Sequence, residues 1–337
     1  MRQAAVDKKN FNKLVTAMLK QGAVRGPVRG DRGVSLADIS GKSTIVFEYE
    51  NFELPLKREF FPQCETLAAY DGGGWHAAAS GDARQRIIFG VRPCDAQSLM
   101  HLDRVFADEK RTDPSYKSRR DRTLVISMAC ETAGPACFCS SVGGGPASAN
   151  GADVVAFNLR NSLLFEAVTP RGEAFLAKNK ALLREVAPAE LKARKDQEAR
   201  ALKELPALAM AGETAAKLAK NFNSPLWESI AETCLSCGAC TYLCPTCHCF
   251  DICDEQQARG GAKVRVHDAC MFASFTREAS GHNPRGRRRE RMRQRVMHKF
   301  SYAPENFGEI FCVGCGRCVV QCPSNIDIRE TVSRVTA

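Results

Sequence analysis

Two short stretches of this chain, C-L-S-C-G-A-C-T-Y-L-C-P at 234–245 and C-V-G-C-G-R-C-V-V-Q-C-P at 312–323, decide how its C-terminal third must fold. Each has the spacing C-x2-C-x2-C-x3-C followed by proline, which is the pattern of bacterial ferredoxins. In that pattern three cysteines wrap one [4Fe–4S] cluster, and the fourth is carried to the neighbouring cluster. A zinc site instead prefers two separated C-x-x-C pairs, so the spacing favours iron–sulfur clusters.

The crossed pattern predicts two ligand sets. One consists of Cys234, Cys237, Cys240 and Cys322 and is called set 2 below. The other consists of Cys312, Cys315, Cys318 and Cys244 and is called set 3. Sixty-seven residues separate Cys244 from Cys312, far more than in a compact ferredoxin. That distance favours an all-helical dicluster module with a helical insertion.

The composition of the whole chain agrees with metal binding. There are seventeen cysteines in 337 residues. The N-terminus lacks the pattern of a signal peptide, and no apolar run is long enough to span a membrane, so we expect a cytoplasmic protein without membrane insertion. In the cytoplasm clustered cysteines serve as metal ligands or redox groups rather than as disulfides.

The formal net charge of +10 raises the question of nucleic-acid binding. Each [4Fe–4S] cluster with four thiolates carries about −2, so part of the basic excess balances buried anions. The most basic stretch, 285–295, fits a helix with Met292, Val296 and Phe300 on its core face. Its arginines either lie near the clusters or form a docking surface for an acidic partner. No nucleic-acid recognition motif accompanies them, so we expect no nucleic-acid partner.

The N-terminal half alternates strand-like and helical segments, which is typical of an α/β domain with a partly parallel sheet. The pattern predicts an amphipathic helix at the N-terminus, helices over 95–107 and 172–186, and strands over 44–50, 87–91, 123–129, 153–159 and 163–168. A helical connector over 189–222 follows, with Ser224-Pro225 at the start of the next helix. We expect an N-terminal α/β domain (1–188), a helical connector (189–224) and a mostly helical ferredoxin-like domain (225–337). Glycine-rich stretches at 72–74 and 143–145 are interpreted as turns.

A further group of cysteines follows two of the predicted strands. Cys94 comes directly after one strand and Cys130 after the next, and Cys137 and Cys139 return in the loop. If the strands are parallel neighbours, Cys94 and Cys130 meet at one sheet edge, where open α/β sheets bind ligands. Asp95 is then the expected N-cap of the helix. Either these four cysteines close a third cluster at the sheet edge (set 1 below), or Cys94 and Cys130 pack as small buried residues. Cys64 is expected to be a packed thiol.

Five motifs, in order along the chain, carry a resemblance to a known family: GVRPCD (90–95), C-x6-C-F-C (130–139), CPTCHCFD (244–251), GHNPR (281–285) and CVGCGRC (312–318). Over about residues 58–328 the chain resembles the β subunit of soluble sulfhydrogenases and the corresponding iron–sulfur subunit of anaerobic sulfite reductase. The resemblance implies an electron-transfer subunit with three [4Fe–4S] clusters, the third held by Cys94, Cys130, Cys137 and Cys139.

The resemblance also implies partners. The protein would lie between a flavoprotein that handles NAD(P)H and a catalytic subunit of hydrogenase, sulfite reductase or heterodisulfide reductase type. FAD is expected on the flavoprotein, since this chain has no G-x-G-x-x-G fingerprint after a strand. No catalytic residue is predicted, because one-electron transfer needs no acid, base or nucleophile. Two other interpretations stay open: a self-contained reductase with an unusual cluster or thiol site, and a redox-sensing binding module.

Four cysteines, Cys247, Cys249, Cys253 and Cys270, belong to none of these sets. They either hold a fourth metal, form a redox-active thiol site, or pack beside the clusters.

Overall fold

The computed structural model describes residues 2–31, 33–41, 43–77 and 84–337. A seven-stranded sheet in the order β1-β9-β8-β7-β6-β2-β3 forms the N-terminal half. Its strands are β1 (Gln3–Asp7), β2 (Ala23–Gly30), β3 (Gly33–Asp38), β6 (Arg86–Val91), β7 (Thr123–Met128), β8 (Val154–Asn158) and β9 (Ser162–Ala167). The four central strands β2, β6, β7 and β8 are parallel, and the outer strands pair antiparallel.

Helices cover both faces of this sheet because its central strands bury both faces. In β6, Ile87 and Phe89 belong to the core under α1 (Phe11–Gln21) and α4 (Pro170–Lys178). The alternate residue Ile88 belongs to the core under α2 (Pro93–Phe106) and α3 (Pro114–Asp121). The predicted amphipathic N-terminal helix is confirmed as α1, and the strands predicted at 87–91, 123–129, 153–159 and 163–168 are confirmed as β6 to β9.

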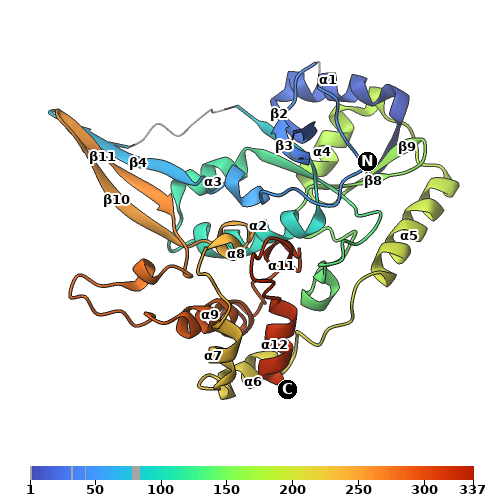
Figure 1. Ribbon diagram of the computed structural model, residues 1–337. Coiled ribbons are helices and arrows are strands. Elements are labelled where there is room, and N and C mark those ends of the chain that lie inside the picture. Colours follow the sequence, from blue (N-terminus) through green and yellow to red (C-terminus); the bar gives the residue numbers. More distant parts are fainter. Residues whose placement is uncertain (1, 32, 42, 78–83) are drawn as a thin grey trace.

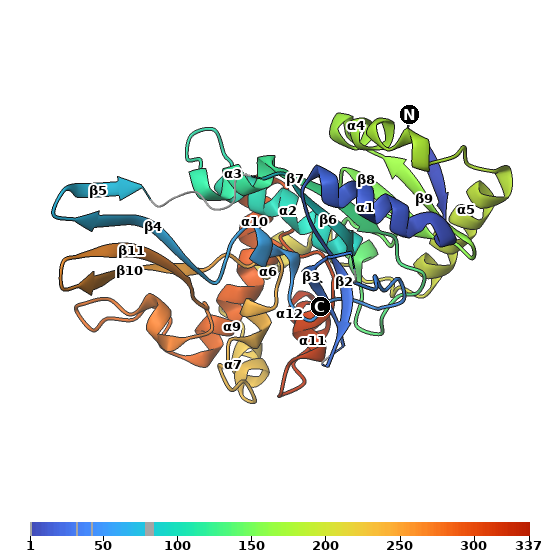
Figure 2. The ribbon, with the colours of Figure 1, turned by 90° about the horizontal axis from the view of Figure 1, so that it is seen from above.

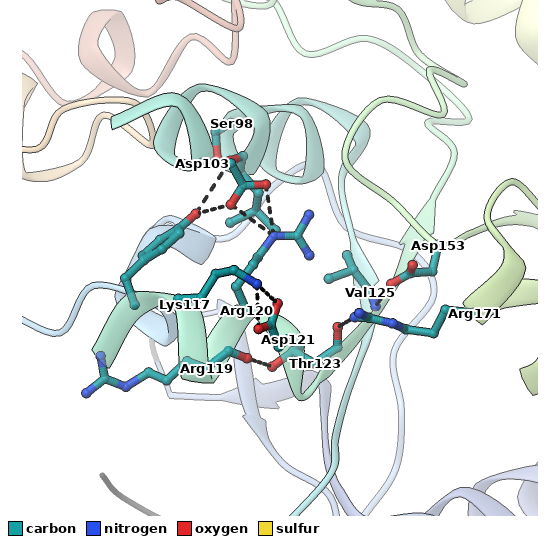
Figure 3. A network of polar contacts seen from close by, with 12 residues as sticks. Ser98, Asp103, Lys117, Arg119, Arg120, Asp121, Thr123, Val125, Asp153 and Arg171 are labelled. Carbon is teal, nitrogen blue, oxygen red and sulfur yellow. Dashed lines mark hydrogen bonds and ion pairs between the residues drawn. The ribbon is translucent and has the colours of Figure 1, made fainter. Parts of the chain in front are cut away.

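Side-chain contacts hold α3 to α2, and they hold β7 to α4 and to the residue before β8. Asp103 of α2 accepts a hydrogen bond from Arg120 of α3 at 3.2 Å, and Arg171 donates to the carbonyl of Thr123. Figure 3 shows both contacts. Asp153 accepts a hydrogen bond from the buried amide of Val125 at 2.9 Å. These bonds hold the strand that ends just before Cys130.

A second sheet projects from the body as an arm (Figures 1 and 2), in the order β10-β11-β4-β5. It joins β4 (Cys64–Asp71) and β5 (Gly74–Ala77) to β10 (Phe250–Gln257) and β11 (Gly260–His267). The expectation of an all-helical dicluster module with a helical insertion is therefore wrong for residues 250–267. At the base of the arm, buried Arg265 binds Glu65 at 2.6 Å and also contacts Asp113.

The rest of the chain is mainly helical. Its helices begin with one that lies beside the large sheet, away from the arm, and continue with others around a third core below the arm (Figure 1). They are α5 (Pro188–Lys203), α6 (Thr214–Lys220), α7 (Leu226–Ala231), α8 (Ala239–Tyr242), α9 (Arg288–Met297), α10 (Ala303–Phe307), α11 (Arg317–Val320) and α12 (Ile328–Thr336). A π-helical turn, His298–Tyr302, connects α9 to α10.

The predicted strand at 44–50 is wrong: in this stretch only Ile45 forms a bridge, to Val28 of β2. The amide of Val46 donates to the carbonyl of Pro27, but Pro27 has no N–H to return a bond, so a ladder cannot continue. Phe47 instead packs on Phe11, with ring centroids 5.2 Å apart.

Candidate iron–sulfur centres

The N-terminal cysteines meet at the end of two parallel strands. Cys94 lies in the first turn of α2 directly after β6, and Cys130 follows β7. One cavity is lined by Cys94, Cys130, Cys137 and Cys139, with Cys315 of the second ferredoxin motif at its border. The structure therefore brings together all four cysteines predicted for set 1.

The predicted N-cap of α2 is wrong. Arg92 is the N-cap and Pro93 is the first helical residue, which places Asp95 within the first turn of the helix. There the Asp95 side chain is completely buried. It faces the second ferredoxin motif instead of capping its own helix.

The first ferredoxin motif forms a tight loop. Ser236 and Gly238 have φ values of 56° and 76°, which let the loop turn between its cysteines. The amide of Ser236 lies 3.4 Å from the sulfur of Cys234, and the amide of Ile326 lies 3.3 Å from that of Cys322. A second cavity is lined by Cys234, Cys237, Cys240 and Cys322, and also by Cys318. The first four are the residues of set 2.

A third cavity is lined by Cys244, Cys312, Cys315 and Cys318, the four residues of set 3. Burial raises the pKa of both Cys312 and Cys315 to about 12. Such thiols give up their protons only to a strong competitor, and a metal is one because it binds the thiolate form.

The second motif packs directly against the N-terminal cysteine loop, residues 130–139. The amide of Phe138 donates to the carbonyl of Gly314 at 2.9 Å. A Cβ atom at Gly314 would lie 2.5 Å from the amide nitrogen of Cys139, and one at Gly316 would lie 2.6 Å from the carbonyl oxygen of Ala136. Only glycine permits this approach, which places Cys315 on the border of both cavities.

A buried ion pair fixes the same junction. Arg317 donates to both carboxylate oxygens of Asp95, at 2.8 and 2.6 Å, and also to the side chain of Asn51 and the carbonyl of Phe52. The side chains of Arg317 and Asp95 are 5% and 0% exposed. Because Asp95 follows Cys94 and Arg317 precedes Cys318, the pair ties set 1 to set 3. We call it the Asp95–Arg317 latch.

Three further buried cations, Lys57, Arg295 and Lys299, lie beside the cysteines and form no ion pair with a carboxylate in the described residues. Lys57 donates to the carbonyl of Cys247 at 2.8 Å, and Lys299 donates to the hydroxyl of Thr246 at 2.9 Å. Burial dominates at Lys57 and lowers its pKa. At Arg295 and Lys299 the surrounding cysteine sulfurs outweigh burial and raise the pKa.

These cations test whether the cysteines fit clusters. A buried charge requires a nearby counter-charge, because desolvation alone makes it costly. Four thiolates around a [4Fe–4S] core supply about −2 at each set. The donor set and the buried cations therefore both fit such clusters.

Most of the basic segment 285–295 lies in the helix α9, as predicted, and the docking surface for an acidic partner stays a prediction. Met292, Val296 and Phe300 are buried as predicted. Arg291 donates to the carbonyl of Met271, and Arg288 donates to that of Cys234. These arginines thus bind the backbone around the first motif.

The remaining cysteines fall into two groups. Cys247, Cys249 and Cys270 lie in the dicluster region, where Cys247 is beside Cys244 of set 3 and Cys249 is beside Cys270, and Cys253 lies exposed on β10. In the described part of the chain, no three His, Cys, Asp or Glu side chains are placed to hold a single metal ion. Cys64, predicted to be packed, is exposed on β4. All seventeen cysteines are free of disulfide bonds.

Comparison with known proteins agrees with this geometry. Residues 233–326 match the family of 4Fe-4S dicluster domains, so the chain is an iron–sulfur protein with a dicluster domain. The chain is also 29% identical to sulfhydrogenase 2 subunit beta of Pyrococcus furiosus, over 99% of this chain and 98% of that protein. The resemblance to sulfhydrogenase β subunits is thus confirmed along the whole chain. None of the helices in the described residues has the length and apolar character needed to cross a membrane.

Proposed function

We propose that this chain is an electron-transfer subunit with three [4Fe–4S] clusters. Set 1 (Cys94, Cys130, Cys137 and Cys139), set 2 (Cys234, Cys237, Cys240 and Cys322) and set 3 (Cys312, Cys315, Cys318 and Cys244) would hold one each. The observation that carries this proposal is that each set lines one cavity, and that neighbouring cavities share a bordering cysteine.

A [4Fe–4S] cluster accepts and donates one electron at a time. The protein's part is to fix the cysteines, to exclude water and to supply counter-charge. The close approach at Gly314 and Gly316 brings the loops of sets 1 and 3 into contact. Cys318 borders the cavities of sets 2 and 3. The three sets therefore form a continuous series from the N-terminal sheet to the surface loop at Cys237, which is exposed.

The relative's name suggests the setting. We infer that this chain works in a hydrogenase-type complex, between a flavoprotein that carries FAD and handles NAD(P)H and a catalytic subunit. Nicotinamides release electrons in pairs, and a flavin is a usual converter to single electrons. The set 1 domain would be residues 1–188, the connector 189–224 and the dicluster domain 225–337. Cysteines that bind metal suit a reducing compartment, so we place the complex in the cytoplasm.

Metal analysis tests the number of clusters. Anaerobically purified protein is expected to contain about twelve irons and twelve sulfides, four of each per cluster. About eight irons would remove set 1 from the proposal, and about sixteen would bring in the remaining cysteines. Stoichiometric zinc with little iron would refute the assignment.

Reduction by nicotinamide tests the relay. The purified chain is expected to be reduced by dithionite but not by NADH or NADPH, as followed by anaerobic bleaching and EPR. Adding the flavoprotein partner is expected to make the clusters reducible by nicotinamide. Rapid reduction of the isolated, flavin-free chain by NAD(P)H would contradict the role as a relay.

A further inference from the structure

Arg295 occupies a position between two of the cysteine sets. It lies in the last turn of α9 and lines both the cavity of set 2 and the cavity of set 3. Its side chain is buried, with only 5% of the residue exposed. One guanidinium nitrogen donates to the carbonyl of Cys240 at 3.2 Å, and Nε has no hydrogen-bond partner among the described residues.

Lys299 lies one turn further along the chain, in the π-helical turn that follows α9, and it lines a different set of cavities. It lines the cavity of set 3 but not that of set 2. Its ammonium group donates to Thr246 Oγ1 at 2.9 Å and to the carbonyl of Phe311 at 3.1 Å. Among the described residues that line these two cavities, Arg295 is thus a buried cation at both, and Lys299 is one at the cavity of set 3 alone.

A buried cation acts strongly on nearby charge, because the protein interior screens it less than water does. A cluster gains one negative charge when it is reduced, so a neighbouring cation favours the reduced state. The reduction potential of such clusters is set by charge, hydrogen bonds and solvent exposure. Arg295 has no carboxylate partner in the described residues that would cancel its charge.

We propose that the buried charge of Arg295 raises the reduction potentials of the clusters at both set 2 and set 3. The charge of Lys299 raises the reduction potential of the cluster at set 3 alone. This inference rests on the proposed cluster assignment. A shared cation shifts both potentials in the same direction, so it makes both sites easier to reduce without changing the difference between them.

Potentiometric titration followed by EPR tests this on the full-length chain with its clusters. Arg295→Met is expected to lower the midpoint potentials of both dicluster signals relative to the wild type. Lys299→Met is expected to lower only one of them, and that one should be the signal lost in Cys312→Ser. Iron content, measured on the same samples, should stay at the wild-type value.

Two controls separate charge from packing. Arg295→Lys keeps the charge and should leave both potentials closer to the wild type than Arg295→Met does. Arg293→Met removes the same charge from the same helix, where the guanidinium stacks on Phe222 at 3.7 Å, and should move neither potential.

The outcomes distinguish this inference from the proposed function. Normal iron content with unchanged potentials in Arg295→Met would overturn the role of Arg295 and leave the cluster assignment standing. Equal shifts in Arg295→Lys and Arg295→Met would show a packing effect and also overturn it. A wild-type chain without dicluster signals would overturn both. If Arg295→Met fails to retain its clusters, Lys299→Met decides: a shift of both signals, or of neither, refutes the proposal.

Discussion

Removing one partner of the Asp95–Arg317 latch is expected to loosen the junction between set 1 and set 3. In Asp95→Ala the guanidinium of Arg317 would stay buried and would lose its two bonds of 2.8 and 2.6 Å to the carboxylate. Breaking a buried pair from one side typically costs about 3–5 kcal/mol. Because both side chains are almost completely buried, we expect Asp95→Ala to lower the free energy of unfolding by about 3–5 kcal/mol.

Iron–sulfur proteins lose their clusters when they unfold, so the rate of cluster release is the practical measure of stability. If the latch is broken in the transition state for unfolding, about 3–5 kcal/mol accelerates cluster release by about two to three and a half powers of ten. Release is followed as loss of visible absorbance in a fixed urea concentration under anaerobic conditions. The matched control is Asp121→Ala, which breaks the exposed pair of Asp121 and Lys117 on α3 (Figure 3). An exposed pair of this kind contributes about 0.3–0.5 kcal/mol, so the control should change the rate about twofold.

A double variant checks the electrostatic reason. Replacing both partners by apolar residues, as in Asp95→Leu with Arg317→Met, removes the unpaired charge and should restore much of the lost stability. Wild-type release rates in Asp95→Ala would refute the reasoning. A double variant that is as unstable as the single one would show that packing, rather than charge, holds the junction.

Five other substitutions test the same architecture. Cys94→Ser should lower the iron content by about four atoms while the dicluster EPR signals persist, Cys244→Ser should damage the set 3 cluster, and Cys64→Ser should change the iron content not at all. Gly316→Ala places a methyl group 2.6 Å from a carbonyl oxygen of the N-terminal cysteine loop, at φ +73°, so it should destabilise the chain by about 1–3 kcal/mol and accelerate cluster release. Asp153→Ala leaves a buried amide of β7 unpaired and should cost about 1–3 kcal/mol in unfolding measurements without changing the EPR signals.

The sequence predicted the parts of the fold that depend on local pattern. Strands β6 to β9 were predictable because they are runs of buried apolar residues, and α1 because Phe11, Leu14, Val15 and Met18 repeat at helical spacing. The spacing of the ferredoxin motifs predicted two sets of cysteines, and each predicted set lines one cavity, with Cys318 lining both cavities. Strands with weaker patterns were missed. β2 contains Gly26 and Pro27, and β10 is largely exposed and rich in acidic residues, so neither has an apolar alternation.

Long-range side-chain pairing could not be predicted. Asp95 and Arg317 are 222 residues apart, and each has a plausible local role, as a helix cap and as a surface charge. Pro93 starts the helix earlier than a cap at Asp95 would allow, which was a detectable signal. The charge on Arg317 required the fold itself, because only the packing of the two cysteine loops shows that it is buried.

The shared sheet of the arm has a consequence for how the chain is made. Strand β4 pairs with β11, and Glu65 at its start binds Arg265, 200 residues later. At about 5–20 residues per second, a ribosome needs roughly 10–40 s to synthesise that interval. During this time β4 has an unpaired edge, which is a site where newly made chains associate wrongly. Strand β4 of the N-terminal half can therefore complete its sheet only after β11 of the dicluster region has been synthesised. We expect truncated chains that end before β11 to aggregate.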